Sequence, residues 1–249
     1  MLVERGLAAS RERARALVIA GRVTVNGRQV SKAGAPVRGS DVVALVEPDH
    51  PYVSRGGVKL AHALDTFGIR VADRLALDIG ASTGGFTDVL LKRHASRVVA
   101  LDVGHGQFDW TLRQDPRVVV IEHVNARTLT ADQLPDGARL FDIVTIDVSF
   151  ISLRHILPVV PPLLREDGDL VALVKPQFEA GRAEVGKGGI VRDDDVRRRV
   201  VTDVAAAANA LGLVRIAEVE SPIAGAEGNR EVLLHLRRRP SPPPGDAGA

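Results

Sequence analysis

Short apolar segments alternate with amphipathic segments from residue 74 onward, and this alternation predicts most of the secondary structure. Runs rich in Val, Leu, Ile and Ala predict buried strands, and the stretches between them carry apolar residues at helical spacing. The predicted strands cover residues 74–80, 97–102, 117–121, 141–147, 169–175, 213–219 and 231–236, and the predicted helices cover 58–67, 85–94, 106–113 and 193–211. Because the strands alternate with helices, the sequence predicts a Rossmann-like α/β fold with a mostly parallel, seven-stranded sheet.

The first 47 residues follow a different pattern, which predicts a small α+β module. Ser10 is a good N-cap for a helix whose apolar positions share one face, and Gly21 provides a stop. Asn26-Gly27 joins two β-branched runs and is a strong signal for a hairpin, because both residues tolerate positive φ. A further strand is expected over residues 42–46.

A proline-containing segment separates the two patterns. Pro48 and Pro51 interrupt regular structure there. We therefore expect a domain at residues 1–47, a linker at 48–57, a second domain at 58–239 and a disordered Pro/Gly-rich tail at 240–249.

Composition excludes several classes of protein. The chain has 249 residues, of which 45% are hydrophobic and only 3% aromatic, so we expect an aliphatic core in one or two domains. No run approaches the ~18 apolar residues of a membrane span, and the N-terminus lacks the apolar region of a secretory signal. Cysteine is absent, which excludes disulfides and thiolate catalysis, and the seven histidines show no metal-ligand spacing. We expect a cytoplasmic protein that needs no metal.

Basic residues are concentrated at the N-terminus. Residues 1–47 hold eight basic and four acidic side chains, whereas the whole chain carries +2, so the remainder carries −2. This asymmetry is typical of a module that docks on nucleic acid, although an ordinary solvated surface would give the same balance.

The segment LVERGLAASRERARALVIAGRVTVNGRQV, with the PVRGSDVV turn that follows, resembles the RNA-binding domain of ribosomal protein S-four. That domain usually opens with Arg-Leu-Asp, whereas this chain begins Met1-Leu2, so we expect a short first helix. The resemblance implies that the module binds the backbone of structured RNA. The candidate contacts are Arg5, Arg11, Arg13, Arg15, Arg22 and Arg28.

A glycine-rich turn after the first strand of the predicted sheet is the candidate cofactor site. It reads DIGASTGGFTD from Asp78 to Asp88, and its glycines allow a ligand to approach the backbone closely. The second strand ends in Asp102, where a carboxylate can bind two ribose hydroxyls. A tight structural turn is the alternative interpretation.

The spacing of Gly80, Gly84 and Gly85 differs from the G-x-G-x-x-G motif of dinucleotide binding. It is similar to the Asp-x-Gly-x-x-x-Gly-Gly-Phe-(Ser/Thr) motif of FtsJ-like class I methyltransferases, which implies S-adenosylmethionine as the cofactor. The resemblance implies cofactor contacts from Asp78, Gly80, Ser82, Thr83, Gly84, Gly85, Phe86, Thr87, Asp102 and Asp147, and it places Asn125 near the adenine. An Asn that caps a strand end is an equal alternative for Asn125.

Four charged residues far apart in the sequence are expected to meet at one edge of the sheet. Asp147 and Lys175 close two parallel strands, whose ends face the same crevice. Glu231 opens the last strand and lies at the same edge if that strand is antiparallel, and Lys59 belongs to the preceding helix. Any one of them alone could be an ordinary solvated charge.

These residues match the Lys-Asp-Lys-Glu tetrad of RNA ribose 2′-O-methyltransferases. A ribose hydroxyl must lose its proton as it attacks a sulfonium methyl group, and a Lys has an ordinary pKa of about 10.4, which desolvation and a second Lys lower. The resemblance implies that Lys175 draws off or stabilises the charge of the hydroxyl. It implies that Lys59 tunes this charge, while Asp147 and Glu231 orient the lysines.

Over residues 1–237 the motifs SRGGVKL, LDIGASTGGFTD, ALDVGHGQ, TIDVSFISL, LVKPQFEAGR and GNREVLLHL resemble the TlyA family. The resemblance implies a cytidine 2′-O-methyltransferase that acts on ribosomal RNA or ribosomal subunits. The oligomeric state is open, and we favour a monomer. This family is also often labelled haemolysin, so a membrane-active protein is one alternative, disfavoured by the absence of a spanning or strongly amphipathic cationic segment. A non-catalytic RNA-binding protein with a vestigial cofactor fold is the other, disfavoured by the intact tetrad.

The segment 179–192 follows Lys175 and is rich in Gly and basic residues. We interpret it as a mobile substrate loop in which Arg182, Lys187 and Arg192 contact RNA phosphates, with a plain solvated loop as the alternative. Arg55 could also bind RNA or hold the linker. The three aspartates at 193–195 are expected to cap the following helix.

Overall fold

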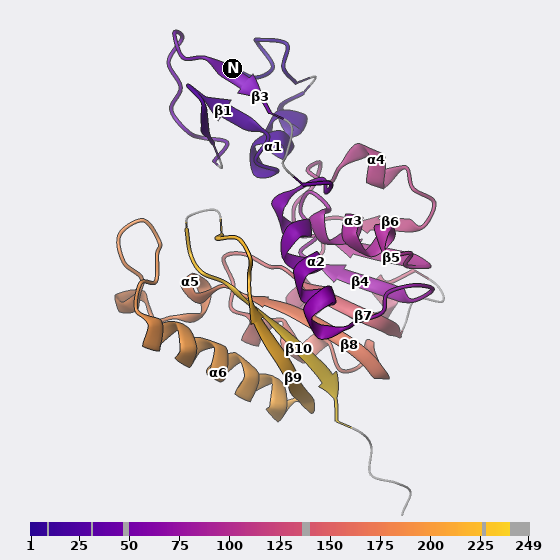
Figure 1. Cartoon of the computed structure of the whole chain (residues 1–249). Helices are drawn as coiled ribbons and strands as arrows, with labels where there is room; N and C mark the ends of the chain where they lie inside the picture. Colours follow the sequence, from indigo (N-terminus) through magenta and orange to yellow (C-terminus); the bar gives the residue numbers. More distant parts are fainter. Residues whose placement is uncertain (9, 31, 47–49, 136–139, 226–227, 240–249) are drawn as a thin grey trace, which may run out of the picture.

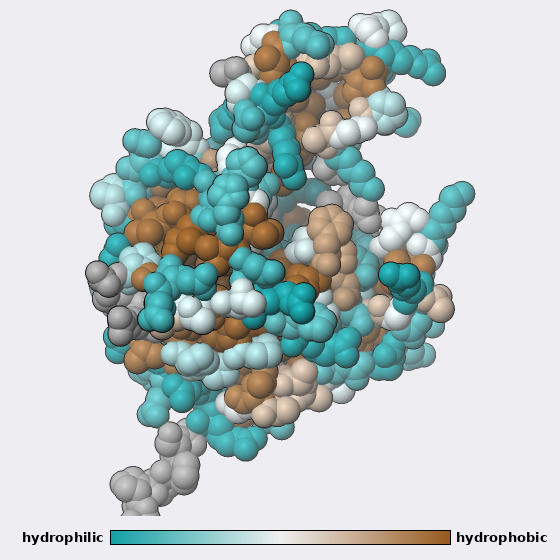
Figure 2. All heavy atoms as spheres, turned by 180° about the vertical axis from the view of Figure 1, so that it is seen from behind, coloured by the Kyte–Doolittle hydropathy of each residue, from teal (hydrophilic) through white to brown (hydrophobic). Residues whose placement is uncertain are grey.

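Two sheets organise the residues described by the computed structural model, which are 1–8, 10–30, 32–46, 50–135, 140–225 and 228–239. A three-stranded antiparallel sheet with the order β2-β1-β3 belongs to the N-terminal module. A seven-stranded sheet with the order β6-β5-β4-β7-β8-β10-β9 forms the larger domain. The N-terminal module stands at one end of the larger domain, and the two bodies touch over a small area (Figure 1; Figure 2).

The N-terminal module forms as its turn chemistry predicts. Ser10 Oγ accepts a hydrogen bond from Arg13 N at 3.1 Å and caps the helix. Asn26 and Gly27 have φ values of 51° and 77°, which suit a tight hairpin. A small core of Ala8, Leu17, Val18 and Val23 holds helix and sheet together. The elements are α1 Arg11–Ile19, β1 Val23–Val25, β2 Arg28–Gln29 and β3 Val43–Leu45.

The larger sheet is parallel except for β10, which runs antiparallel to both of its neighbours. This confirms the predicted fold class. It also brings the start of β10 to the edge where β4, β5, β7 and β8 end. The strands are β4 Leu75–Ile79, β5 Arg97–Leu101, β6 Val118–Ile121, β7 Phe141–Ile146, β8 Leu164–Val174, β9 Leu213–Glu220 and β10 Val232–Arg238.

Helices cover both faces of this sheet (Figure 1). Because successive strand residues point to opposite faces, Ala76 packs beneath α2 and α3, whereas Leu77 packs in the other core with α6. The helices are α2 Arg55–Phe67, α3 Gly85–Lys92, α4 Trp110–Arg113, α5 Pro176–Glu179 and α6 Asp194–Ala210.

Several predicted boundaries were wrong for local reasons. The helix α2 begins at Arg55, within the predicted linker. Gly56 and Gly57 can belong to its first turn because the small residues let this turn pack closely against the start of α3. The helix expected at 106–113 is reduced to α4, since Gly106 has a φ of 68°. The strand expected at 169–175 already begins at Leu164. The predicted tail at 240–249 and part of the predicted linker lie outside the described residues.

A buried charged network ties the far end of the sheet together. Asp169 on β8 accepts hydrogen bonds from Arg74 Nη1 at 2.6 Å and Arg237 Nε at 2.7 Å, and its Oδ1 lies 2.7 Å from His235 Nε2. Burial acts to raise the pKa of Asp169, but the hydrogen bonds from His235, Arg74 and Arg237 outweigh it and hold the pKa well below its usual range. The carboxylate therefore stays ionised and joins three segments of the chain.

We expect Asp169→Ala to lower the free energy of unfolding by about 3 kcal/mol near pH 7, because it removes the carboxylate that pairs with partly buried Arg74 and buried His235. Since the folded pKa of Asp169 is lowered, its contribution is complete above the usual aspartate range and is lost as the pH falls toward the folded value. Urea unfolding at several pH values measures this difference, with exposed Asp167→Ala as the control. A loss that stays constant as the pH falls would contradict the assignment.

Candidate active site

A cavity of about 320 Å³ lies at the edge of the sheet where the parallel strands end. The turn after β4, the ends of β7 and β8, the first turn of α2 and the residue before β10 all contribute to it. The N-terminal module adds Ile19 and Lys32, so both parts of the chain enclose the cavity. The principal lining residues are Ser54, Arg55, Gly56, Lys59, Gly80, Ala81, Ser82, Thr83, Gly85, Phe86, Asp147, Ser149, Phe150, Lys175, Gln177, Phe178 and Glu231.

The four predicted tetrad residues meet in this cavity as two ion pairs. Lys175 Nζ lies 2.6 Å from Asp147 Oδ1 and donates a hydrogen bond to Ser149 Oγ at 2.8 Å. Lys59 pairs with Glu231 and donates a hydrogen bond to Glu231 Oε2. Each lysine therefore has its own carboxylate, although the paired residues are far apart in the sequence.

The electrostatics of this cluster follow from its burial. Burial acts to raise the pKa of Asp147, but the charges of Lys175 and Lys59 outweigh it and lower the pKa below its usual value. Glu231 is 2% exposed and Lys59 is 8% exposed, so this pair is shielded from water. Two carboxylates thus balance two ammonium groups beside a cavity large enough for a ligand.

Glycines let the backbone approach this cluster. A Cβ on Gly80 would meet the backbone oxygen of Asp147 at 2.5 Å, so only glycine allows the end of β4 to lie against the end of β7. A Cβ on Gly225 would collide with Glu231 Oε1, and one on Gly85 would collide with Ser54 Oγ. We did not identify Gly225 from the sequence, because nothing local indicates that its segment lies beside Glu231.

Asp78 and Thr87 support the glycine-rich turn and do not line the cavity. Both are fully buried. Thr87 Oγ1 donates to Asp78 Oδ2 at 2.7 Å, and Thr145 Oγ1 donates to Asp78 Oδ1 at 2.9 Å. Burial outweighs these hydrogen bonds and raises the pKa of Asp78 to about 7. Both predicted cofactor residues thus contact protein atoms next to the turn, and neither lines the cavity.

Some of the other residues predicted to bind the cofactor line the cavity, and the rest lie outside it. Gly80, Ser82, Thr83, Gly85, Phe86 and Asp147 line the cavity, whereas Gly84, Asp102 and Asn125 do not. Asp102 Oδ2 accepts a hydrogen bond from Ser82 N at 2.8 Å, which fixes the acid beside the turn. Asn125 Oδ1 accepts from Arg127 N at 3.0 Å, so the structure shows the capping role that was the alternative for this residue.

The turn and the cavity fit S-adenosylmethionine. Gly80, Ser82 and Gly84 all have positive φ, so the turn curves around the space in which a ligand would approach its backbone. Asp147 Oδ1 is buried and lies 2.6 Å from Lys175 Nζ, its ion-pair partner. Asp147 also lines the cavity, so its carboxylate is placed to attract a positively charged ligand group beside the turn.

Some of the arginines predicted to contact RNA in the N-terminal module bind protein atoms instead. Arg5 donates to the backbone oxygens of Asp41 at 2.7 Å and Gly39 at 2.8 Å, so it braces its own module. Arg13 forms an ion pair of 3.2 Å with Asp109, which joins the two modules. Arg22 is half-buried and donates to the oxygen of Val46 at 3.4 Å. Arg11, Arg15 and Arg28 are exposed, and Arg5 and Arg13 are exposed as well despite their contacts.

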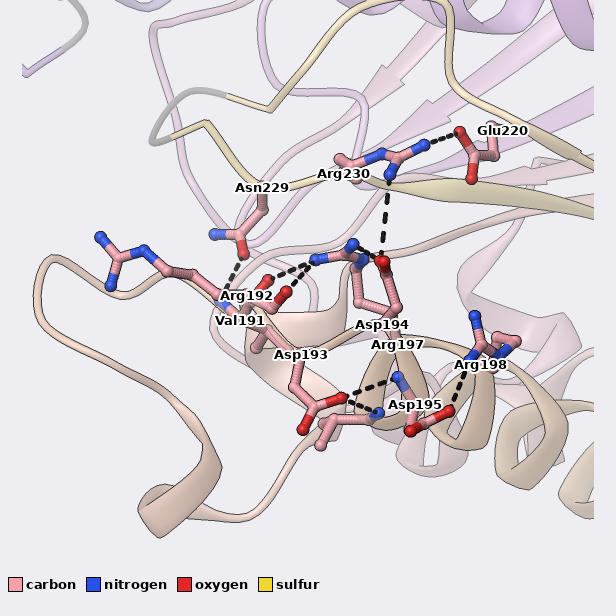
Figure 3. Close-up of polar contacts among 11 residues, drawn as sticks. Val191, Arg192, Asp193, Asp194, Asp195, Arg197, Arg198, Glu220, Asn229 and Arg230 are labelled. Carbon is pink, nitrogen blue, oxygen red and sulfur yellow. Dashed lines mark hydrogen bonds and ion pairs between the residues drawn. The ribbon is translucent and has the colours of Figure 1, made fainter.

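The basic segment after Lys175, predicted to be a mobile substrate loop, makes several hydrogen bonds with neighbouring segments. Arg182, Lys187 and Arg192 are exposed, and the side chain of Arg192 extends away from the neighbouring polar network (Figure 3). Both the nitrogen and the oxygen of Val191 are hydrogen-bonded to side chains. As predicted, Asp193 caps α6, because its Oδ1 accepts from Asp195 N at 2.8 Å.

An aromatic pair at the mouth of the cavity was missed in the sequence. Phe150 is 92% exposed and has a φ of 66°, and its ring lies 5.3 Å from that of Phe178. A positive φ is uncommon for a bulky residue, and residues in such strained conformations cluster at functional sites. The available signal was an aromatic residue four positions after the end of β7, in a chain with few aromatics.

Comparisons with known proteins agree with this arrangement. Residues 52–238 match the FtsJ-like methyltransferase family, and residues 1–43 match the S4 domain. A 16S/23S rRNA (cytidine-2'-O)-methyltransferase TlyA from Mycobacterium tuberculosis is 48% identical across 95% of this chain and 87% of that protein. Hemolysin A from Brachyspira hyodysenteriae is 43% identical across 93% of this chain and 95% of its own. A solved Streptococcus thermophilus structure with a hemolysin name is 44% identical, with a TM-score of 0.76 over 97% of this chain and 87% of that one.

Fold and site together therefore define an S4 domain joined to an FtsJ-like methyltransferase domain. The chain belongs to the TlyA family of these methyltransferases. No helix among residues 1–239, as far as the structure describes them, is both long and apolar enough to cross a bilayer.

We expect Asp78→Asn to bind S-adenosylmethionine as tightly as the wild type within about twofold, because Asp78 faces Thr87 and Thr145 and not the cavity. Since the folded pKa of Asp78 is raised to about 7, the stability of the wild type relative to the variant should fall as the pH rises from 4 through 7. Calorimetric titration and urea unfolding measure the two effects. A large loss of cofactor affinity would restore Asp78 as a cofactor ligand.

Proposed function

We propose that this protein transfers a methyl group from S-adenosylmethionine to the ribose 2′-hydroxyl of cytidine in ribosomal RNA. The observation that carries the proposal is the meeting of Lys59, Asp147, Lys175 and Glu231 in one cavity beside the glycine-rich turn. The name of the Mycobacterium tuberculosis relative supports the base and the class of RNA. Ribosomal RNA, free or within a subunit, is the proposed partner.

The cofactor would be held by the backbone of the turn at residues 80–85, with Asp102 at its ribose and Asp147 near its charged end. When bound, S-adenosylmethionine supplies a methyl group on a positively charged sulfur. Asp102 is already fixed next to Ser82, and Phe86 forms an apolar wall that is 3% exposed. These residues would orient the cofactor and leave its methyl group directed toward the tetrad.

Lys175 acts on the hydroxyl in this proposal. Its Nζ would hold the 2′-oxygen. As a neutral amine it would take the hydroxyl proton, and as an ammonium it would balance the negative charge on the oxygen while that proton passes to water. Asp147 and Ser149 fix Nζ from two sides, at 2.6 and 2.8 Å, so the amine cannot turn away from the cavity. Lys59, oriented by Glu231, adds positive charge nearby. Holding the hydroxyl in line with the methyl group supplies much of the remaining rate.

Phe150 would receive the base of the target nucleotide. An enzyme that acts on a nucleotide in structured RNA must expose it, and an unstacked base gains from stacking on an aromatic ring. Phe150 and Phe178 offer such a surface beside Lys175. Exposed Arg11, Arg15 and Arg28 would contact RNA phosphates from the N-terminal domain, and Arg55 would do so from the cavity wall.

The domain division that we propose keeps RNA binding at residues 1–47 and methyl transfer at 58–239, with α2 extending into the segment between them. The name Hemolysin A of one relative keeps a membrane-active protein as the contrasting hypothesis. The paired tetrad supports methyl transfer, because a pore would have no use for two lysines enclosed with two acids. Labelled S-adenosylmethionine with separated ribosomal subunits, followed by mapping of the modified ribose, tests the proposal.

We expect Lys175→Ala to abolish methyl transfer to ribosomal RNA while cofactor affinity stays nearly unchanged, because Lys175 contacts the hydroxyl and not the turn. Lys92→Ala is the matched control, since Lys92 carries the same charge on α3 outside the cavity. Incorporation of the labelled methyl group and calorimetric binding measure the two properties. Activity retained by Lys175→Ala would remove the mechanism.

We expect Phe150→Ala to reduce kcat/KM for ribosomal RNA by about tenfold, because loss of one base stack weakens binding by about 1–3 kcal/mol. Phe150→Trp should retain most of the activity, since the larger ring can still stack. Steady-state kinetics with ribosomal RNA as the varied substrate measure both variants. If Trp is as harmful as Ala, Phe150 does not act by stacking.

A further inference from the structure

A buried amide joins the basic loop to the segment that carries Glu231. Asn229 is 1% exposed, and its side chain uses both of its polar atoms. Its Nδ2 donates to the backbone oxygen of Gly189 at 2.8 Å, and its Oδ1 accepts from Val191 N at 2.9 Å. Figure 3 shows this side chain aimed at the loop from the chain segment just before β10. An amide is required, because a carboxylate cannot donate to Gly189 and an aliphatic side chain can do neither.

The loop that Asn229 holds is a tight turn with Lys187 at its tip. Gly186 pairs with Ile190 as a bridge, and the oxygen of Gly186 accepts from Gly189 N at 3.0 Å. Gly188 has a φ of 81°, which this turn requires. Lys187 is exposed, so the geometry presents its ammonium group to solvent at a fixed place.

Further contacts lock the same two segments. Arg197 on α6 donates to the oxygens of Val191 at 3.1 Å and Arg192 at 2.8 Å, so both sides of Val191 are bound. Arg230, the residue after Asn229, contacts Glu220 at 2.6 Å and Asp194 at 3.9 Å (Figure 3). The loop is thus fixed to α6 and to the approach to β10.

Asn229 is also linked to the tetrad. Its backbone oxygen accepts from Gly225 N at 2.8 Å, and Gly225 lies directly against the Glu231 carboxylate. Two residues along the chain, Glu231 pairs with Lys59. A single short segment therefore sets the position of Lys187 and that of a tetrad acid.

We propose that Asn229 is a positioning residue that fixes the turn 186–190 so that Lys187 binds an RNA phosphate at a set distance from the tetrad. This inference rests on the proposed function, because it assumes that RNA occupies the cavity mouth. Lys187 supplies the positive charge that binds the phosphate. Asn229 only holds the turn that positions Lys187. A phosphate contact contributes affinity and salt dependence without reading sequence.

Four proteins test the proposal: Asn229→Ala, Lys187→Ala, the double variant and the control Asn209→Ala. Asn209 is exposed at the far end of α6, where its side-chain oxygen accepts a hydrogen bond from Arg239. Binding of 16S and 23S rRNA transcripts is measured at several salt concentrations. We expect both single variants to weaken binding about fivefold and to reduce the slope of log Kd against log salt by about 0.7–0.9. The double variant should be no weaker than the weaker single variant, because Asn229 acts through Lys187.

Hydrogen exchange of the Val191 amide reports, without RNA, whether Asn229 still holds the loop. The exchange rate should be faster in Asn229→Ala and unchanged in Asn209→Ala. Gly188→Ala strains the turn without touching the core, and it should reproduce the binding defect if Asn229→Ala fails to fold. Additive effects, or an unchanged salt slope in Asn229→Ala, would overturn the proposal. If the wild type itself neither binds nor methylates ribosomal RNA, the proposed function fails. The exchange data then still show whether Asn229 holds the Val191 amide.

Discussion

The pairing of two ammonium groups with two carboxylates at one edge of the sheet is the constraint on which the site depends. Like charges could not be gathered in a half-buried cavity without opposite charges beside them, since an unpaired buried charge is strongly destabilising. Asp147 beside Lys175 and Glu231 beside Lys59 satisfy this requirement. The same pairs hold the amines where a substrate hydroxyl would lie. Stability and positioning are therefore provided by the same contacts.

Glycines, which have no side chain, allow the backbone segments around the tetrad to approach one another closely. Gly80 lets β4 reach the end of β7, and Gly85 lets α3 begin against the first turn of α2. Gly225 plays the corresponding part beside Glu231. These close approaches bring elements carrying all four charged residues within side-chain reach, and they leave the cavity on the open side of the turn.

Charged side chains in this protein serve the fold as often as the proposed chemistry. Arg5 braces a loop of its own module, Arg13 joins the modules, and Asp169 ties together the far end of the sheet. Asp78 is enclosed by two threonines. Position in a motif or in a basic stretch thus does not separate a binding residue from a supporting one. The contacts of each side chain in the folded protein distinguish the two roles.

The sequence by itself determined the sheet class, the hairpin at Asn26-Gly27, the glycine-rich turn and the four tetrad residues, because periodicity, turn chemistry and the ends of strands are local properties. Tertiary structure decided which lysine pairs with which acid, that Asp78 is enclosed, that Arg5 binds backbone oxygens of its own module, and that Phe150 stays exposed. It also decided that Asn229 holds a loop about 40 residues away, which no spacing in the sequence indicates. The physical reason is that a side chain's partners are set by packing between distant segments, whereas its local pattern reports only the element on which it lies.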